Sequence, residues 1–407
     1  MPESAETVEA KPMLEIPEPT SLEFRHNAIE IYQRLLREQP VLPLSEGRYL
    51  ICRHADVRWA LRDHDKVARP TTWSSARKPP GPFREFGNNN MIAMNPPDHT
   101  RFRKAIMRAF SPQKVTALTD FVTTTCDSLI DRMAQQKRGD FIDDFAYPLP
   151  VAVICAMLGI PATNHEVLRE GSAAMLAGLE LSASPEELAH AGDAAQRLFD
   201  FLRALVEERR SDLGDDLLSL LLRHQQEDHL SSDEVVWAAI TLLLAGHETT
   251  THLLGNGLLA LMHAPGDFDR LFRQPQLIGN AVEEFLRFDP SLYVLFRQTT
   301  EPVELDGVAI PAGAILILSL AAANRDPRLF EEPDRLDVSR KNADQHLTFA
   351  AGRHLCAGQA VARLEGRIAF ERLVRRLHDF ELDGDPVPRN GLMFKGYHAL
   401  PVRYSPR

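Results

Sequence analysis

A cysteine in a glycine-rich loop is the first candidate for chemistry in this chain. Cys356 lies four residues after Gly352, two before Gly358, and directly ahead of a segment with helical periodicity. A thiolate there is stabilised by backbone N–H donors and by the positive end of a helix dipole, and the glycines let the backbone approach the sulfur. The loop also fits an inert cysteine in a helix-start turn. A zinc site with His346 and His354 is weaker, because no standard four-ligand spacing appears.

A second candidate is the stretch LLLAGHETTTHLL inside a long apolar segment. Gly246 weakens a helix, and the Thr249 hydroxyl can bond to the carbonyl four residues earlier. We therefore expect a local distortion, at which Glu248 and Thr249 serve a proton path. The alternative is a helix that only tolerates polar residues on its solvent side.

Two helical pairs and one coil are less specific. Glu284 and Arg287 lie three residues apart, and His99 and Arg103 lie four apart, so each pair shares a helix face. Taken alone, each pair is typical of a solvated face. The charged, proline-punctuated stretch Ala322–Arg340 lacks periodicity, and a coil of this length inside a compact domain is usually functional.

The elements that must position these residues are mostly helices. The apolar periodicity predicts helices over Ile29–Glu38, Asp56–Asp63, Arg101–Phe110, Val115–Arg138, His165–Leu179, Pro185–Asp212, Ser231–His263, Ile278–Phe288 and Gln359–Leu377. Strand signals are fewer: RYLIC, AILIL, and VELDGVAI with its Asp306–Gly307 turn. No repeat or interdomain linker is evident. We expect one mainly α-helical domain, residues 21–407, with a small β region.

Composition excludes several classes of protein. The 407 residues carry a net charge of -11, which argues against nucleic acid as the main partner. Four scattered cysteines without CxxC spacing indicate a reducing compartment. Residues 1–20 are acidic and proline-bearing, typical of a disordered tail and not of a signal peptide. The apolar run Val235–Gly246 is too short to cross a bilayer, so we expect a cytoplasmic protein, as a monomer, without membrane contact.

Together these residues resemble the cytochrome P450 family, in its soluble bacterial, haem-thiolate form, from about residue 25 to the end. The residues that match the cysteine-loop signature are Phe349, Gly352, His354, Cys356 and Gly358. Those that match the oxygen-activation motif are Ala245, Gly246, Glu248 and Thr249. Glu284 and Arg287 match the ExxR pair, and Arg335 matches the third member of that buried network. Ala350 departs from the family, which usually has glycine there.

The resemblance implies a haem b held between the long central helix and the cysteine-loop helix. Cys356 would ligate the iron, and Glu248 and Thr249 would deliver protons to bound oxygen. The residues implied to hold the two haem propionates are His99, Arg103, Arg297 and His354. The implied pocket walls are Thr71–Ile92, Leu176–Ser184, Leu242–Ala245 and Leu292–Phe296, which includes Val294 and Leu295, with Met393 and Phe394. These are mostly apolar, which favours a lipophilic substrate.

The implied activity is a monooxygenase that uses O2 and electrons from NAD(P)H, through ferredoxin reductase and ferredoxin. Helical geometry places Arg101, Lys104 and Arg108 opposite the face of His99, and with Arg353 they form a basic docking patch for ferredoxin or an ordinary solvated face. Rival activities are a peroxide-driven haem-thiolate enzyme, a non-catalytic haem sensor and a cysteine-nucleophile hydrolase. The Glu248–Thr249 pair speaks against the first two.

Overall fold

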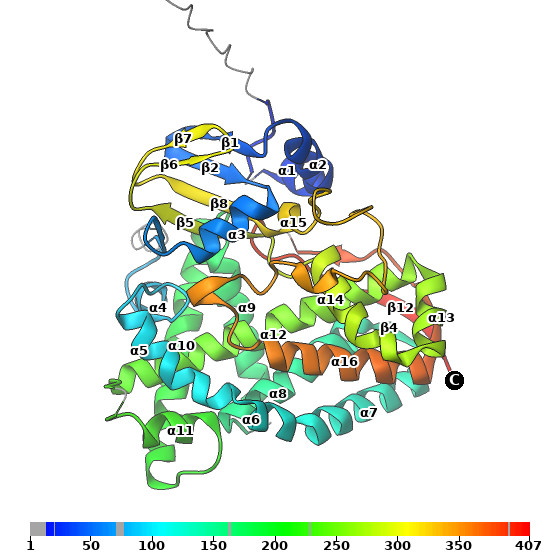
Figure 1. Ribbon diagram of the computed structural model, residues 1–407. Helices are drawn as coiled ribbons and strands as arrows, with labels where there is room; N and C mark the ends of the chain where they lie inside the picture. The colour runs from blue at the N-terminus through cyan, green and yellow to red at the C-terminus, as the bar shows by residue number, and fades with distance from the viewer. Residues whose placement is uncertain (1–13, 20, 71–76, 162–163, 228, 390) are drawn as a thin grey trace, which may run out of the picture.

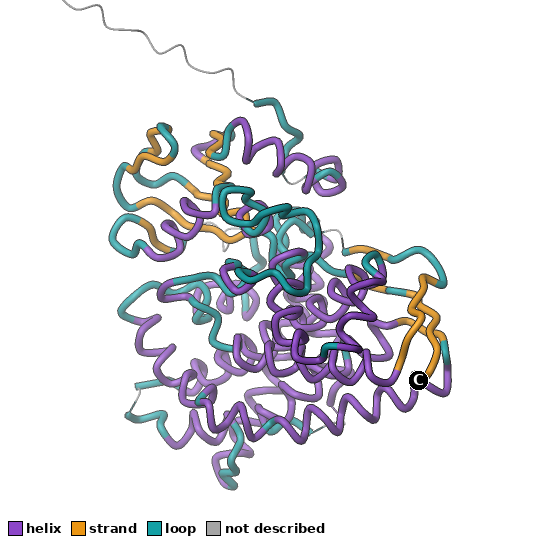
Figure 2. Tube along the Cα trace, turned by 45° about the vertical axis from the view of Figure 1, so that its right-hand side comes forward, coloured by secondary structure: helices purple, strands orange, loops and turns teal. Residues whose placement is uncertain are grey.

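A computed structural model describes residues 14–19, 21–70, 77–161, 164–227, 229–389 and 391–407. Most of the expected tail, residues 1–13 and 20, lies outside the described residues, as does 71–76 of the expected pocket loop. Figure 1 shows a broad helical body with a smaller strand-rich region along one side. The tube view in Figure 2 shows the same division into a helical part and two outlying groups of strands. The mainly α fold with a small β region is confirmed.

Sixteen α-helices occur in the described residues. Their bounds are α1 Leu22–His26, α2 Ala28–Glu38, α3 His54–Arg62, α4 Pro82–Asn89, α5 Asp98–Met107, α6 Pro112–Ala117, α7 Thr119–Gln136, α8 Pro148–Leu158, α9 His165–Leu179, α10 Pro185–Ser211, α11 Leu217–Arg223, α12 Ser232–Met262, α13 Pro265–Arg273, α14 Ile278–Phe288, α15 Leu320–Ala323 and α16 Gln359–Arg376. In the described part of the chain, none of them combines the length and apolar character needed to cross a bilayer.

Twelve strands are described. They are β1 Val41–Pro43, β2 Arg48–Ile51, β3 Val67–Ala68, β4 Arg138–Asp140, β5 Val294–Thr299, β6 Val303–Leu305, β7 Val308–Ile310, β8 Ile315–Ser319, β9 Leu377–Leu382, β10 Val387–Pro388, β11 Tyr397–Ala399 and β12 Pro401–Pro406. The largest sheet has the order β1-β2-β8-β5-β3, with β2 and β8 parallel. The order of the second sheet is β4-β12-β9, so the C-terminal strand pairs with a strand from the middle of the chain.

Strand β8 of the five-stranded sheet is buried on both faces. Along β8, Ile315 and Ile317 pack into the cluster that contains α2, whereas Leu316 and Leu318 pack into the cluster that contains α3. Side chains of a strand alternate between faces, so a strand covered on both sides must be apolar throughout. This explains the unbroken run AILIL.

Helix α12 passes through the middle of the helical body. Ser231 and Glu234 form a capping box at its start, which explains why the helix begins where the sequence predicts. It is apolar on all sides, and most of its side chains are buried. The α-helix is continuous from Ser232 to Met262 and is not interrupted at Gly246, where the sequence predicts a distortion. A Cβ at Gly246 would lie 2.9 Å from Ile154 Cδ1, so this glycine instead lets α8 approach closely.

Other predictions were wrong in bounds or missed an element. The single helix expected over Val115–Arg138 is two helices, because the N–H of Leu118 bonds to Val115 three residues back and ends α6. Helix α8 was not predicted, because the run VAVICAML is apolar all round and shows no periodicity. The C-terminal strands β9 to β12 were also missed, since their short pairings are set by distant partners.

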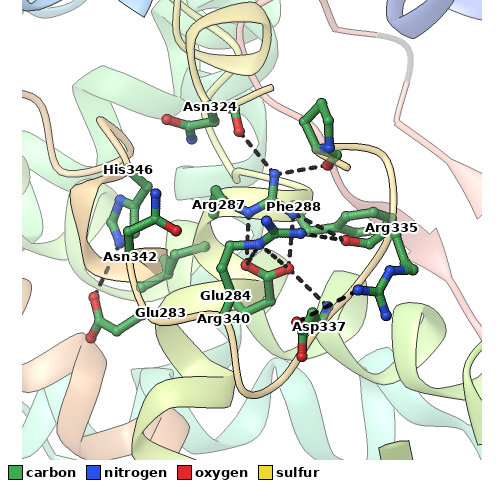
Figure 3. Close-up of polar contacts among 12 residues, drawn as sticks. Glu283, Glu284, Arg287, Phe288, Asn324, Arg335, Asp337, Arg340, Asn342 and His346 are labelled. Carbon is green, nitrogen blue, oxygen red and sulfur yellow. Dashed lines mark hydrogen bonds and ion pairs between the residues drawn. The ribbon is translucent and has the colours of Figure 1, made fainter. Parts of the chain in front are cut away.

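A buried ion cluster ties α14 to the long coil that follows α15 (Figure 3). The side chains of Glu284 and Arg287 are fully buried and make a two-pronged ion pair, with N–O distances of 2.7 and 2.8 Å. Arg287 also donates to the carbonyl oxygens of Asn324 and Pro333, both at 2.9 Å. The coil therefore closes over α14 through charges that are fully hydrogen-bonded, as buried ions require.

The third member of this cluster is Arg340, which corrects the expectation for Arg335. The Arg340 Nε atom lies 3.1 Å from both carboxylate oxygens of Glu284. The Arg335 side chain is 61% exposed and pairs with Glu332 and Asp337 at the surface. Only its backbone carbonyl joins the cluster, accepting from Arg340 at 3.0 Å and from Arg287 at 3.4 Å. Because the coil has no periodicity, sequence spacing did not indicate which arginine turns inward.

This correction predicts a contrast between two arginine substitutions. Arg340→Ala removes a hydrogen-bonded partner of a buried carboxylate, and breaking such a pair costs about 3–5 kcal/mol. Arg335→Ala removes an exposed pair and should change the free energy of unfolding by less than about 1 kcal/mol. Chemical denaturation of both variants measures the two values. Equal losses would mean that the assignment of Arg340 is wrong.

Candidate functional site

A cavity of about 560 Å³ lies between α12 and the loop that leads into α16. Its walls come from α4, α8, α9, α12, β5, the segment around residues 391–394 and the cysteine loop. The expected site residues that line it are Leu242, Ala245, Gly246, Thr249, Leu292, Leu295, Phe296, Arg297, Phe349, His354, Cys356, Gly358, Met393 and Phe394. Residues that are distant in the sequence therefore line the same cavity.

Two expectations for the walls differ from the structure. Val294 does not line the cavity, because it packs in the core between the five-stranded sheet and α2. The expected loop Thr71–Ile92 contributes Arg77, Lys78, Phe86, Gly87, Asn90, Met91 and Ile92, whereas its residues 71–76 lie outside the described residues. From Leu176–Ser184 the cavity receives Leu176, Gly178, Leu179, Glu180 and Leu181.

The cysteine loop presents a sulfur to this cavity. The N–H of Cys356 donates to Phe349 O at 2.9 Å and closes the loop. Burial raises the pKa of the Cys356 thiol, while N–H donors from Gly358 and Gln359 at the start of α16 act to lower it, as do nearby arginines. These donors suit a sulfur that carries negative charge, and a metal ion deprotonates a coordinating thiol outright.

Two residues of this loop have left-handed backbone conformations. Gly352 has φ +68°, and a Cβ there would lie 2.5 Å from Leu61 O, so only glycine allows the loop to pack on α3. Gly352 thus supports the loop and does not line the cavity. Ala350 has φ +58°, a conformation that costs an alanine roughly 1–2 kcal/mol. The departure at Ala350 therefore affects the local backbone energy.

A cluster of basic side chains gathers beside the sulfur. We define the basic cluster as Arg69, His99, Arg103, Arg297 and His354. The rings of His99 and His354 have centroids 4.1 Å apart, and Arg103 donates to Leu355 O at 2.7 Å. Arg69 and Arg297 both donate to Phe296 O, at 3.2 and 2.9 Å.

The basic cluster has no internal counter-charge. Among the described residues, no carboxylate forms an ion pair with any of its members, and neither Arg69 Nε nor His99 Nε2 has a hydrogen-bond partner. Burial lowers the pKa of His99 to about 4 and that of Arg297 well below its ordinary value, with neighbouring cations adding to both effects. The imidazole of His99 is therefore neutral at ordinary pH, whereas a buried arginine such as Arg297 is costly without a counter-charge, so the cluster fits an anionic ligand.

These residues fit haem. Its two propionates would supply the missing negative charge to the basic cluster, its apolar ring suits the apolar walls, and Cys356 would supply the thiolate. Sequence reasoning identified four members of the cluster and missed Arg69. A lone arginine in a loop carries no spacing signal, and only the fold places it beside Arg297.

The zinc alternative has no support in the described residues, among which no three His, Cys, Asp or Glu side chains group as metal ligands. The ring of His346 is committed elsewhere, with Nε2 3.2 Å from Glu283 and Nδ1 accepting from the N–H of Thr348. His346 therefore supports the loop from behind.

Glu248 and Thr249 occupy different environments although they are adjacent. Thr249 lines the cavity, and its hydroxyl donates to Ala245 O at 3.0 Å. Glu248 is buried outside the lining, in an ion pair with Arg389 and beside His252. Burial acts to raise the pKa of Glu248, but His252 and Arg389 outweigh it, so the pKa is lowered and the carboxylate stays ionised.

The expected docking residues differ in their contacts. Lys104 and Arg353 are exposed. Arg101 is bound to Glu234 at the start of α12, and Arg108 lies 3.8 Å from Glu227. The positive charge of Arg101 is thus largely neutralised by an acidic residue of the protein itself.

Comparison with known proteins agrees with this geometry. The family model described as cytochrome P450 matches residues 49–396. The vitamin D(3) 25-hydroxylase of Pseudonocardia autotrophica is 37% identical, with 94% of this chain and 95% of the relative covered. Cytochrome P450 107B1 of Saccharopolyspora erythraea is 36% identical, with 93% and 95% covered. The crystal structure of CalO2 aligns with a TM-score of 0.90 at 30% identity, over 96% of this chain and 98% of that one. With a cysteine loop that presents its sulfur to the cavity and the basic cluster beside it, the chain belongs to the cytochrome P450 family.

Proposed function

We propose that this P450 inserts one oxygen atom of O2 into a lipophilic small molecule, with electrons from NAD(P)H delivered through a ferredoxin reductase and a ferredoxin. The observation that carries the proposal is the combination of a cysteine sulfur, an uncompensated basic cluster and apolar walls around one cavity. A cysteine hydrolase would have no use for the basic cluster.

Each part of the cavity has a task in this proposal. Iron protoporphyrin bound at Cys356 supplies the activation of O2, and thiolate ligation favours cleavage of the O–O bond. The basic cluster holds and orients the two propionates. Side chains such as Leu242, Leu295 and Phe296 exclude water and bind an apolar substrate.

Cys356→Ala tests the thiolate assignment. The parent protein should bind haem, and its reduced carbon monoxide complex should show the strongly red-shifted Soret band of thiolate ligation. The variant should lose that band because no other cysteine lines the cavity among the described residues. Cys155→Ala, which alters a core cysteine, is the matched control and should keep it. A Cys356→Ala protein that retained the band would refute the assignment.

The proton path is a further part of the proposal. Thr249 offers a hydroxyl at the cavity wall, and Ser291 Oγ donates to the Thr249 carbonyl at 2.6 Å, which fixes this turn of α12 from outside the helix. Glu248 lies behind the wall as an ionised carboxylate, so it would first accept a proton from the protein side, then pass it on toward Thr249 and return to its ionised form. Peroxide-driven oxidation would need no such supply.

Thr249→Ala should uncouple electron uptake from product formation, so that fewer of the electrons consumed lead to oxidised substrate. The variant should bind haem and substrate as before but release a several-fold larger share of its reducing equivalents as hydrogen peroxide. Thr251→Ala is the matched control, since its hydroxyl bonds to His247 O on the same helix away from the cavity. The measurement is the ratio of product and peroxide to NADPH consumed. Unchanged coupling in Thr249→Ala would count against the relay.

Electron entry is proposed at the exposed cations beside the cysteine loop. Arg103 donates to Leu355 O and so ties α5 to that loop, and the exposed Lys104 and Arg353 follow Arg103 on α5 and precede Cys356 in the loop, respectively. Basic residues there stand out in a chain of net charge -11 and suit an acidic ferredoxin. Arg101 and Arg108 contribute less, because each faces an acidic partner.

The double variant Lys104→Glu with Arg353→Glu tests this docking surface. Reduction by an acidic ferredoxin should slow at least tenfold at low salt and lose most of its salt dependence, because charge steering acts on the association rate. Arg34→Glu with Arg273→Glu alters net charge equally at exposed sites on α2 and α13 and should leave the rate within twofold. Reduction by dithionite should be the same in all three proteins. An unaltered ferredoxin rate in the first variant would place docking elsewhere.

A further inference from the structure

A lysine points into the cavity without a carboxylate partner. Lys78 precedes α4, lines the cavity, and is only 4% exposed. Its ammonium lies 5.1 Å from the centroid of the Phe83 ring, a contact that offsets only part of the cost of burying a charge. None of the ion pairs among the described residues involves it, and burial lowers the pKa of Lys78 to about 8.

The other described charged residues of the wall are accounted for. Arg77 donates to the carbonyl oxygens of Leu181 and Ala183, and Arg48 pairs with Glu18. Glu180 accepts three backbone N–H groups, from Leu392, Met393 and Phe394, each at 3.0 Å. Burial raises the pKa of Glu365 on α16 well above its ordinary value and so disfavours the charged form of this acid. Arg69, Arg297 and His354 belong to the basic cluster.

The position of Lys78 is held by α4. Its backbone carbonyl accepts hydrogen bonds from the Arg84 guanidinium, with Nε at 2.9 Å, so the segment before the helix is anchored. A Cβ at Gly87 would lie 2.6 Å from the Lys78 Nζ atom, so the ammonium occupies space that exists because residue 87 is glycine. The ammonium of Lys78 is therefore held in place before any ligand binds, and such preorganisation lowers the entropic cost of binding.

We propose that Lys78 binds the carboxylate of the substrate, so that the preferred substrates are lipophilic carboxylic acids. This inference rests on the proposed function and narrows it from lipophilic molecules to amphipathic acids. A carboxylate at Nζ would compensate the buried charge with a charge-assisted hydrogen bond, and the apolar walls would take the hydrocarbon part.

The walls also set the direction of binding. The ring of Phe83, over which the ammonium lies, packs against Gly178 of α9, whereas Cys356 enters from the loop before α16. An acid held at Lys78 from the α4 side would extend its hydrocarbon end along the apolar walls of the cavity that Cys356 also lines. Oxidation should fall on carbons remote from the carboxyl group.

The test compares acids with alcohols of equal chain length. Saturated acids of 8 to 16 carbons and the matching primary alcohols are titrated into the ferric holoenzyme, with affinity measured by the haem absorption shift and by calorimetry. In the parent protein the best acid should bind at least tenfold more tightly than its alcohol. Lys78→Met should bring that ratio close to one by weakening the acid and should leave the alcohol within twofold. Lys66→Met, which removes an exposed lysine that pairs with Glu301, should keep the parent ratio.

Three results would overturn the inference. One is a parent protein that binds no acid more tightly than its alcohol. Another is an acid preference that survives in Lys78→Met. The third is a loss of haem from Lys78→Met but not from Lys66→Met, which would assign the lysine to the cofactor. Failure of the proposed function is distinguishable, because it appears beforehand as a parent protein without the thiolate carbon monoxide band.

Discussion

The basic cluster beside Cys356 is the constraint on which the rest of this structure depends. Five basic side chains from α5, β5, the cysteine loop and the segment after β3 converge without a carboxylate among the described residues. Burial disfavours such charges, so the fold is complete only with an anionic ligand in place. Any ligand that binds the native state alone adds its binding free energy to stability. Haem binding and folding are therefore expected to be coupled in this chain.

The ion cluster on α14 solves the same electrostatic problem within the protein. Glu284 is shared by Arg287 and Arg340, and the remaining guanidinium N–H groups reach backbone carbonyls of the coil. The coil also contacts the segment before the cysteine loop. The side chain of Asn324 accepts from the N–H of Leu347 and donates to the hydroxyl of Thr348. The ion cluster on α14, whose charges are paired within the protein, thus supports the cysteine loop. The basic cluster beside that loop has no such pairing and would be neutralised by a ligand.

Helix α12 separates two chemical environments across a single turn. Successive helical residues are rotated by about 100°, so Thr249 faces the cavity while Glu248 faces Arg389 and His252. An acid on the cavity wall itself would add negative charge where haem and a lipophilic substrate must fit. Keeping the carboxylate one residue behind the hydroxyl leaves this turn of α12 uncharged on its cavity side and keeps an ionised group close to it.

Local patterns in the sequence determined much of this protein. The capping box at Ser231 set the start of α12, the spacing of Glu284 and Arg287 placed both on one face of α14, and the glycine loop identified Cys356. Such features depend on neighbours within one or two helical turns, so the sequence displays them directly. The tertiary structure alone decided that Arg340 and not Arg335 reaches Glu284, and that Arg69 joins the basic cluster. It also turned Val294 into the core and Lys78 into the cavity. These residues lie in coils or on a strand with both faces buried, where no periodicity records which way a side chain turns, and packing between distant segments makes the choice.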